Sequence, residues 1–216
     1  MRPRPVKGAK EKIAAHPEYV VSIARGATVD LRKHIKGKGP LHLEIGACKG
    51  AFIHAMGLRH PDIQFIAVEK FDHAMIKLLD KLLATPLPNV LAVRADAMDL
   101  ARCLPPQSIE RIYLNFSDPW PKARHAKRRL THPTFLKQYA SWLEPHGELV
   151  FKTDNRNFFE ESICQFSQQG WEIMTVSLDL HADQDPDNVM TEFEARFSQL
   201  GPIYRLTAKL KEETSR

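Results

Sequence analysis

The sequence predicts an α/β fold with a mostly parallel sheet of seven strands, helices on both faces and an antiparallel pair at the C-terminal edge. Two observations support this prediction. From residue 41 onward, short apolar runs alternate with stretches of helical periodicity, which is the pattern of successive β–α–β units. The last two apolar runs lack this regular spacing, so we expect them to form the antiparallel edge.

Seven apolar runs are the expected strands. They are residues 41–45, 64–69, 89–95, 109–116, 148–153, 171–178 and 203–210. Helices are expected between them, at residues 51–60, 72–84, 131–147, up to about 169, and 191–200. In the third helix, Thr131 is the candidate N-cap and Gly147 lies past the end. We expect a single domain over residues 1–216, with a basic N-terminal extension at about 1–38.

The composition is that of an ordinary soluble protein, with 43% hydrophobic and 26% charged residues. No uncharged apolar run approaches the roughly 18 residues that a membrane helix needs. The three cysteines, Cys48, Cys103 and Cys164, are widely spaced, and their spacing suggests neither a disulfide framework nor a zinc site. We therefore expect a cytoplasmic protein without a structural metal.

Positive charge is concentrated in two segments of the chain. Residues 1–38 contain ten Lys and Arg against three Asp and Glu, and residues 122–129 contain five Lys and Arg without an acid. The rest of the chain is slightly acidic. Because a general solubility device would be spread along the chain, two basic concentrations indicate a polyanionic partner.

Four acids stand where the first four predicted strands end. They are Glu44, Glu69, Asp96 and Asp118. Ligands of parallel sheets bind beyond the carboxyl ends of the strands, so these side chains are expected at a binding edge. Each acid taken alone is best explained as the cap of a following helix. Four acids at consecutive strand ends favour a nucleotide-like ligand instead.

Gly46 and Gly50 follow the first strand, where glycine lets the backbone turn tightly and approach a ligand. An acid after the second strand can accept hydrogen bonds from ribose hydroxyls, and one after the third can accept from an adenine amino group. The dinucleotide fingerprint G-x-G-x-x-G is absent, because Cys48 and Ala51 fill its second and third glycine places. Glu44 beside the turn suits a cationic ligand better than a diphosphate.

Four motifs carry a resemblance to a known family. They are E-I-G-A-C-K-G (44–50), N-F-S-D-P-W-P-K (115–122) with the H-A-K-R-R that follows it (125–129), F-K-T-D-N (151–155) and T-E-F-E (191–194). The first, with Glu69 and Asp96, resembles class I S-adenosylmethionine-dependent methyltransferases. The full set resembles bacterial tRNA (guanine-N7-)-methyltransferases, from about residue 18 to residue 205. The resemblance implies a Rossmann-like class I methyltransferase fold and methyl transfer to N7 of a guanine in the tRNA variable loop, position 46.

The resemblance also implies roles for particular residues. The cofactor, S-adenosylmethionine, would be bound by Glu44, Gly46, Glu69, Asp96 and Asp118, and Asp118 would also be catalytic. The substrate would be bound by Lys122, Asp154, Thr191, Glu192, Phe193 and Glu194. RNA would be contacted by Arg124, His125, Lys127, Arg128 and Arg129. Some relatives pair, so a homodimer is expected.

Asp118 and Trp120 each precede a proline, which drives a residue towards extended backbone geometry and predicts a stiff loop. Asp118 would then be held in place at little entropic cost. Trp120 offers a flat face for a base, although packing in the core explains it equally well. Guanine N7 carries a free lone pair and needs no general base, so the acid would serve to favour the developing positive charge.

Three alternatives remain open at the level of the sequence. Thr191 and Glu194 have the spacing of a helix capping box and can serve as one. Alternatively, Glu192 or Glu194 accepts hydrogen bonds from guanine N1–H and N2–H. Asp154 is either a substrate ligand or a helix N-cap. Because Cys48 replaces the middle glycine of the family's first motif, an RNA-binding protein with a decayed cofactor site is the alternative to an enzyme.

Overall fold

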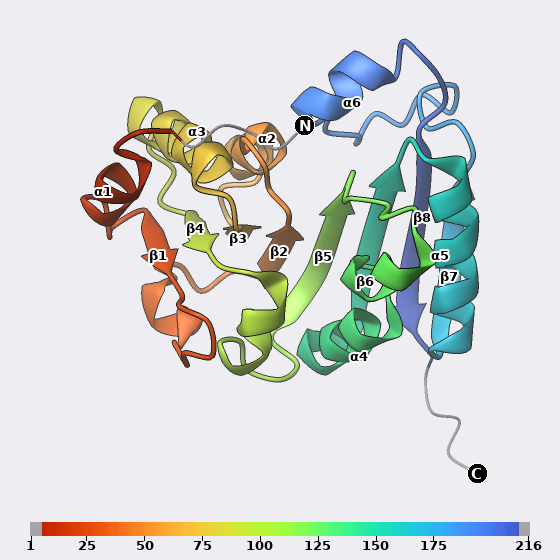
Figure 1. Ribbon diagram of the computed structural model, residues 1–216, viewed down its shortest axis with the longest axis horizontal. Coiled ribbons are helices and arrows are strands. Elements are labelled where there is room, and N and C mark those ends of the chain that lie inside the picture. The colour runs from red at the N-terminus through yellow and green to blue at the C-terminus, as the bar shows by residue number, and fades with distance from the viewer. Residues whose placement is uncertain (1–5, 212–216) are drawn as a thin grey trace. The chain divides into compact units, whose positions relative to one another are not determined.

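Figure 1 shows a computed structural model of the protein, which describes residues 6–211. Its elements belong to two units. The N-terminal unit runs to Pro105 and includes Val189–Glu192, and the C-terminal unit comprises Pro106–Asn188 and the chain from Phe193 onward. Each unit contains four strands and the helices that pack against them.

The strands of the N-terminal unit are all parallel and lie in the order β1-β4-β3-β2. They are β1 (Val20–Ser22), β2 (Leu41–Ile45), β3 (Gln64–Glu69) and β4 (Val90–Arg94). Every residue of β2 and β3 is buried, as expected of parallel strands that are covered on both faces. The helices of this unit are α1 (Ala9–Ala14), α2 (Ala51–Arg59) and α3 (Asp72–Ala84), with short 3-10 helices η1 (Leu31–His34) and η2 (Ala97–Arg102).

α3 shows why the apolar pattern produces the fold. Met75, Leu79 and Leu82 recur at helical spacing and are fully buried. This face packs against β3, β4, α1 and α2. Burial of such side chains stabilises the folded state by about 1.5–3 kcal/mol each.

The strands of the C-terminal unit lie in the order β5-β6-β8-β7. They are β5 (Ile109–Asn115), β6 (Leu143–Thr153), β7 (Trp171–Ser177) and β8 (Tyr204–Leu210), and the helices are η3 (Ala123–Arg128), α4 (Pro133–Trp142), α5 (Arg156–Gln168) and α6 (Glu192–Phe197). β5 and β6 are parallel, whereas β8 pairs antiparallel with both β6 and β7. α5 packs along β7 (Figure 1). The predicted mixed α/β class with an antiparallel C-terminal edge is thereby confirmed.

Two details of the fold differ from the sequence prediction. The described residues contain eight strands instead of seven, because Val20–Ser22 forms the short strand β1 beside β4. The predicted helix at 131–147 is shorter, since it ends at Trp142 and β6 begins at Leu143. Leu143 pairs with Ile109 of β5, and this distant partner ends the helix before Gly147.

The N-cap of α4 is also different from the prediction. His132 caps the helix, because its Nδ1 accepts a hydrogen bond from the Thr134 N–H at 3.2 Å. Pro133 occupies the first helical turn, where its missing N–H is not needed. The hydroxyl of Thr131 instead makes a buried hydrogen bond with the hydroxyl of Ser162, at 2.9 Å. Thr131 therefore ties this segment to α5.

Candidate functional site

The carboxyl ends of β2, β3 and β4 bring four of the predicted cofactor residues to one edge of the N-terminal unit. Glu44 is the fourth residue of β2, and Gly46 follows the strand. Glu69 is the last residue of β3 and pairs in register with Arg94 of β4, two residues before Asp96. Since the three strands are parallel neighbours, the predicted edge exists.

The turn after β2 is a tight backbone structure at this edge. The N–H groups of Gly46 and Ala47 both donate to the Val68 carbonyl, each at 2.9 Å. Gly46 has φ +86° and a Cβ there would meet nothing within 4 Å, so the turn faces open space at this residue. At Gly50, with φ +78°, a Cβ would lie 2.3 Å from Leu78 Cδ1. Cys48 has φ +51°, a conformation that favours glycine.

Glu69 links this turn to the loop after β3. Its Oε2 accepts from the Cys48 N–H at 3.0 Å, and its Oε1 accepts from the Phe71 N–H at 2.8 Å. The side chain is nearly buried, with 7% of the residue exposed. Burial raises the pKa of the Glu69 carboxyl, and the N–H bonds from Phe71 and Cys48 act against that shift. The Lys70 N–H also bonds the carboxylate and acts in the same direction.

Glu44 and Asp96 differ strongly in exposure. Glu44 is buried on β2, with 2% of the residue exposed. The side chain of Asp96 is 46% exposed, and its Oδ2 lies 3.7 Å from Lys70 Nζ. Asp96 also caps η2, because its Oδ1 accepts from the Met98 N–H at 3.1 Å. The capping role that an acid at a strand end suggests is therefore present at Asp96.

Asp118 and Asp154 follow the parallel pair β5 and β6 of the C-terminal unit, and both are exposed. The Phe116 N–H donates to the Lys152 carbonyl at 2.8 Å and so extends the pairing to the start of the Asp118 loop. Asn155 caps α5, because its Oδ1 accepts from the Phe158 N–H at 2.9 Å. The alternative reading of Asp154 as the N-cap is therefore wrong.

The loop of Asp118–Pro121 departs from the predicted geometry at Trp120. This residue has φ +42°, although extended backbone was expected before Pro121. The Arg129 guanidinium holds the loop here, since Nε donates to the Pro119 carbonyl at 2.8 Å and Nη2 to the Trp120 carbonyl at 3.0 Å. The loop is thus fixed by bonds from a distant residue, as well as by its prolines.

Trp120 is contacted by two side chains of the basic segment. The ring of His125 meets it edge-on, with 5.6 Å between the ring centroids. The Arg128 Cζ lies over the Trp120 ring, 4.9 Å from its centroid. Trp120 is half-buried. It is therefore neither a fully packed core residue nor a bare aromatic surface.

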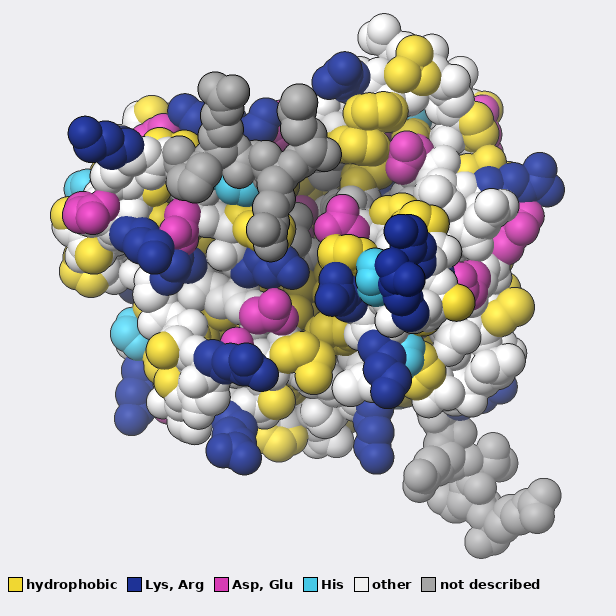
Figure 2. All heavy atoms as spheres, in the orientation of Figure 1, with side chains coloured by type: hydrophobic (Ala, Val, Ile, Leu, Met, Phe, Trp, Pro, Cys, Tyr) yellow, Lys and Arg dark blue, Asp and Glu magenta, His cyan; other side chains and the backbone are white. Residues whose placement is uncertain are grey.

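The basic segment 122–129 is mostly exposed. Lys122, Arg124, Lys127 and Arg128 are exposed, whereas Arg129 is buried, with 9% of the residue exposed. Figure 2 shows several Lys and Arg side chains gathered beside a histidine, over the green helical turn that Figure 1 draws next to β6. Of the five residues predicted to contact RNA, Arg124, Lys127 and Arg128 are thus exposed, His125 is half-buried and Arg129 is buried.

The T-E-F-E segment leads into α6, and its residues differ in exposure. Glu194 is fully buried: its Oε2 lies 2.6 Å from Lys152 Nζ and its Oε1 accepts from Asn188 Nδ2 at 2.7 Å. Glu192 is exposed, and its carboxylate lies 3.6 Å from Lys81 Nζ. Thr191 is half-buried.

Two aromatic rings contact Phe193. Phe193 is 39% exposed, stacks on Phe197 with 3.9 Å between centroids, and contacts Phe116 at 4.9 Å. Phe116 was not predicted to belong to the site, although an aromatic residue directly before the Asp118 loop was a visible signal. Lys152 was missed too, and a lysine inside an apolar strand usually has a buried acidic partner.

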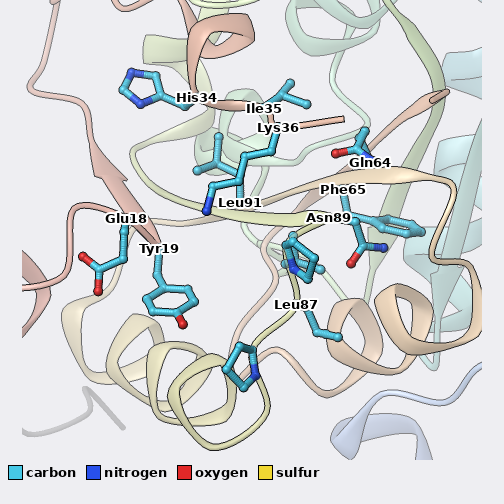
Figure 3. A pocket seen from close by; sticks show the side chains of 13 residues that line it. Glu18, Tyr19, His34, Ile35, Lys36, Gln64, Phe65, Leu87, Asn89 and Leu91 are labelled. Atoms are coloured by element: carbon cyan, nitrogen blue, oxygen red, sulfur yellow. The ribbon is translucent and has the colours of Figure 1, made fainter. Parts of the chain in front are cut away.

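A cavity of about 120 Å³ lies elsewhere in the N-terminal unit, at the amino ends of β3 and β4 (Figure 3). Its lining includes Tyr19, Lys36, Gln64 and Asn89. Asn89 Nδ2 donates to the carbonyls of three residues, Gly57, His60 and Ile63, and therefore has a structural role. This cavity is at the opposite end of the strands from Glu69.

Within residues 6–211, no group of three or more His, Cys, Asp or Glu side chains is arranged to hold a metal ion. Over the same residues, no helix has the length and apolar character that crossing a membrane requires.

Comparisons with known proteins agree with this arrangement. A family model described as "Putative methyltransferase" matches residues 38–206. The tRNA (guanine-N(7)-)-methyltransferase of Streptococcus equi subsp. zooepidemicus is 46% identical over 96% of this chain and 99% of its own length. The enzyme of the same name from an Exiguobacterium species is 44% identical over 96% of this chain and 97% of its own.

Solved structures show the same fold at low sequence identity. The 16S rRNA methyltransferase KamB matches with a TM-score of 0.63 and 14% identity, covering 87% of this chain and 98% of its own. The antibiotic-resistance methyltransferase Kmr matches with a TM-score of 0.57 and 17% identity, covering 85% and 92%. The class I methyltransferase fold that the sequence predicted is thus confirmed.

Proposed function

Because the chain belongs to the tRNA (guanine-N(7)-)-methyltransferase family, we propose that it transfers the methyl group of S-adenosylmethionine to N7 of a guanine in tRNA. The observation that carries the proposal is the match of 46% identity over nearly the whole chain. We further propose that the target guanine lies in the variable loop, at position 46.

The N-terminal edge suits the cofactor. Gly46 faces open space, Glu69 places a carboxylate beside the turn as the acceptor for ribose hydroxyls, and the exposed carboxylate of Asp96 can accept from an adenine amino group. Glu44 supplies negative charge for the cationic end. S-adenosylmethionine, when bound, supplies a methyl group on a sulfonium that a lone pair can attack.

The chain's contribution to the chemistry is to orient the reactants and to favour the charge that develops. Guanine N7 has an in-plane lone pair, so no residue has to remove a proton first. Asp118 is an exposed carboxylate in the loop after β5, and Arg129 holds the backbone of this loop at the Pro119 carbonyl. We assign Asp118 the catalytic role of favouring the cationic purine as it forms, because preorganised charge acts most strongly there. We also assign Asp118 to the binding of the cofactor.

The substrate residues are assigned by exposure. Lys122, Asp154 and Glu192 are exposed and available to the tRNA. Phe193 presents a partly exposed ring on which a base that has left its stack can rest. Glu194 is held by Lys152 and Asn188, so we assign it to anchoring α6, with Thr191 at the start of the helix. Glu192 is then the acid placed to accept from guanine N1–H and N2–H.

The exposed cations of the basic segment are assigned to tRNA phosphates, with His125 and Arg128 also supporting Trp120. The double variant Arg124→Gln/Lys127→Gln should bind tRNA with a flatter dependence of log affinity on log salt. Each lost phosphate contact removes roughly 0.7–0.9 from the slope. Filter binding at four salt concentrations measures this slope.

The matched control for this prediction is Lys137→Gln/Arg156→Gln, which removes the same charge from exposed residues of α4 and α5. Its slope should equal that of the wild type. An equal loss of slope in both variants would mean that only net charge matters, and would contradict a phosphate site at the basic segment.

Glu69→Ala should weaken binding of S-adenosylmethionine at least tenfold and leave tRNA affinity unchanged. The carboxylate bridges the Cys48 and Phe71 N–H groups and is the proposed ribose acceptor. Losing a charged hydrogen-bond partner costs about 1.5–3 kcal/mol. Titration calorimetry measures both affinities, with Glu160→Ala on the exposed surface of α5 as the control. Wild-type cofactor affinity in a folded variant would remove Glu69 from the site.

The direct test of the proposed function is incubation with unmodified tRNA and methyl-labelled S-adenosylmethionine, followed by nucleoside analysis. The expected product is 7-methylguanosine from the variable loop. If the protein is instead an RNA-binding protein with a decayed cofactor site, tRNA binds, no nucleoside is labelled and the cofactor produces no binding heat. We also propose that the protein works in the cytoplasm and forms a homodimer. Light scattering of the pure protein measures its mass and so tests the homodimer.

A further inference from the structure

Arg129 differs from the other cations of the segment 122–129. It is buried, and its guanidinium points its donors at protein atoms. Nε donates to the Pro119 carbonyl at 2.8 Å, and Nη2 donates to the Trp120 carbonyl at 3.0 Å. Nη1 makes an ion pair with Glu161. These contacts occupy all three nitrogens of the guanidinium.

The loop that Arg129 holds has few other anchors available in its own backbone. Pro119 and Pro121 have no N–H, so this stretch can be held mainly through its carbonyls. Trp120 adopts φ +42° directly before Pro121, a conformation that an L-residue rarely takes. Such a conformation persists only when the surrounding structure enforces it. The two hydrogen bonds from Arg129 to successive carbonyls provide this enforcement.

The ion pair of Arg129 with Glu161 attaches the guanidinium to α5. Glu161 lies on this helix, and the neighbouring Ser162 hydroxyl bonds the Thr131 hydroxyl at 2.9 Å. The same Ser162 hydroxyl donates to the Phe158 carbonyl at 2.7 Å. α5 packs against β6, β7 and β8. Arg129 is thus fixed to the packed core of the C-terminal unit on one side and to the Asp118 loop on the other.

We propose that Arg129 and Glu161 are positioning residues for methyl transfer, which hold the carbonyls of Pro119 and Trp120 and thereby Asp118. Arg129 accordingly does not bind RNA phosphate, unlike its exposed neighbours. The inference rests on the proposed function, because Asp118 is the residue that it positions. A carboxylate misplaced by about 1 Å can cost roughly a hundredfold in rate.

Substitution by lysine separates the two roles. A phosphate contact needs a cation, and lysine supplies one, so Arg129→Lys would leave a phosphate-binding role nearly intact. The positioning role needs a planar guanidinium that bonds the Pro119 and Trp120 carbonyls and the Glu161 carboxylate at the same time. A single ammonium nitrogen at the end of a flexible stem cannot reproduce this arrangement.

R129K should lower kcat about a hundredfold, with KM for tRNA within threefold of the wild type and an unchanged salt slope. The matched control is Arg156→Lys, which makes the same change at an exposed arginine paired with Glu160 on α5. It should behave as the wild type. Glu161→Gln should lower kcat in the same direction by about tenfold, because the buried guanidinium loses its counter-charge.

A second readout needs no substrate. Of the three tryptophans, Trp142 and Trp171 are each 1% exposed, so a change in quenching of fluorescence by acrylamide reports mainly on Trp120. In the wild type the quenching should be limited. It should increase severalfold in R129K and less in Glu161→Gln. A residue with a general structural role would instead shift the melting temperature without selectively exposing Trp120.

The outcomes are distinct. Wild-type kcat and quenching in folded R129K would overturn the proposal, because lysine could then replace arginine here, as it can at a phosphate contact. If circular dichroism shows that R129K does not fold, Glu161→Gln makes the same comparison, because the side chain of Glu161 is 43% exposed and its substitution disturbs the core less. If the wild type forms no 7-methylguanosine, the proposed function fails, and the quenching comparison still decides whether Arg129 orders the loop.

Discussion

Asp118→Asn is expected to fold and to bind tRNA, yet to transfer methyl groups at least about a hundredfold more slowly than the wild type. The substitution keeps the size of the side chain and removes the negative charge assigned to the reacting centre. Asp118 is exposed and follows β5, so the fold does not depend on its charge. The loop geometry should also persist, because Arg129 holds the backbone of Pro119 and Trp120 and not the carboxylate.

Single-turnover kinetics with saturating S-adenosylmethionine and tRNA measure this effect directly. Asp62→Asn is the control, because this exposed acid belongs to neither proposed site. Filter binding and thermal melting should give wild-type values for both variants. Turnover of Asp118→Asn within a few-fold of the wild type would show that the charge has no role in the transfer.

A tRNA with 7-deazaguanine at position 46 is expected to bind normally and to accept no methyl group at all. The substitution replaces the acceptor nitrogen by a carbon without a lone pair. Among the described residues, the proposed site offers the acid Asp118 and no recognisable general base. This suits N7, whereas guanine N1 and the exocyclic amine would have to lose a proton. Affinity should survive, because most of it comes from phosphates that the substitution does not touch.

The measurement uses tRNA assembled from a synthetic fragment, labelled cofactor and nucleoside analysis. The control is the same tRNA with 7-deazaguanine at a guanine outside the variable loop, which should be methylated at the wild-type rate. Undiminished methylation of the position-46 substrate would show that another atom or another nucleotide is the acceptor. The mechanism proposed for Asp118 would then have to be abandoned.

Local pattern was sufficient to predict most of the fold. β2, β3 and α3 have the bounds that were predicted, because the apolar side chains that define each element are neighbours in the sequence. The errors occur where a distant partner decides. α4 ends at Trp142 since Leu143 pairs with Ile109, and β1 is a strand of three residues that exists through its pairing with β4.

The sequence by itself also determined the family, since the motifs around Asp118 and Thr191 identified the relatives that the full-length match confirms. It placed acids at the strand ends, because the order of strands and helices dictates where each strand stops. The further roles proposed for these acids are still predictions. What sequence could not decide is which charges face the protein and which face solvent.

That decision belongs to the tertiary structure. Arg128 and Arg129 are adjacent cations in one basic segment, yet the first lies over the Trp120 ring and the second is buried on two carbonyls and Glu161. Glu194 is likewise buried against Lys152, 42 residues away. A charge can be buried only where partners satisfy it, and these partners come from segments that the fold, and not the local sequence, brings together.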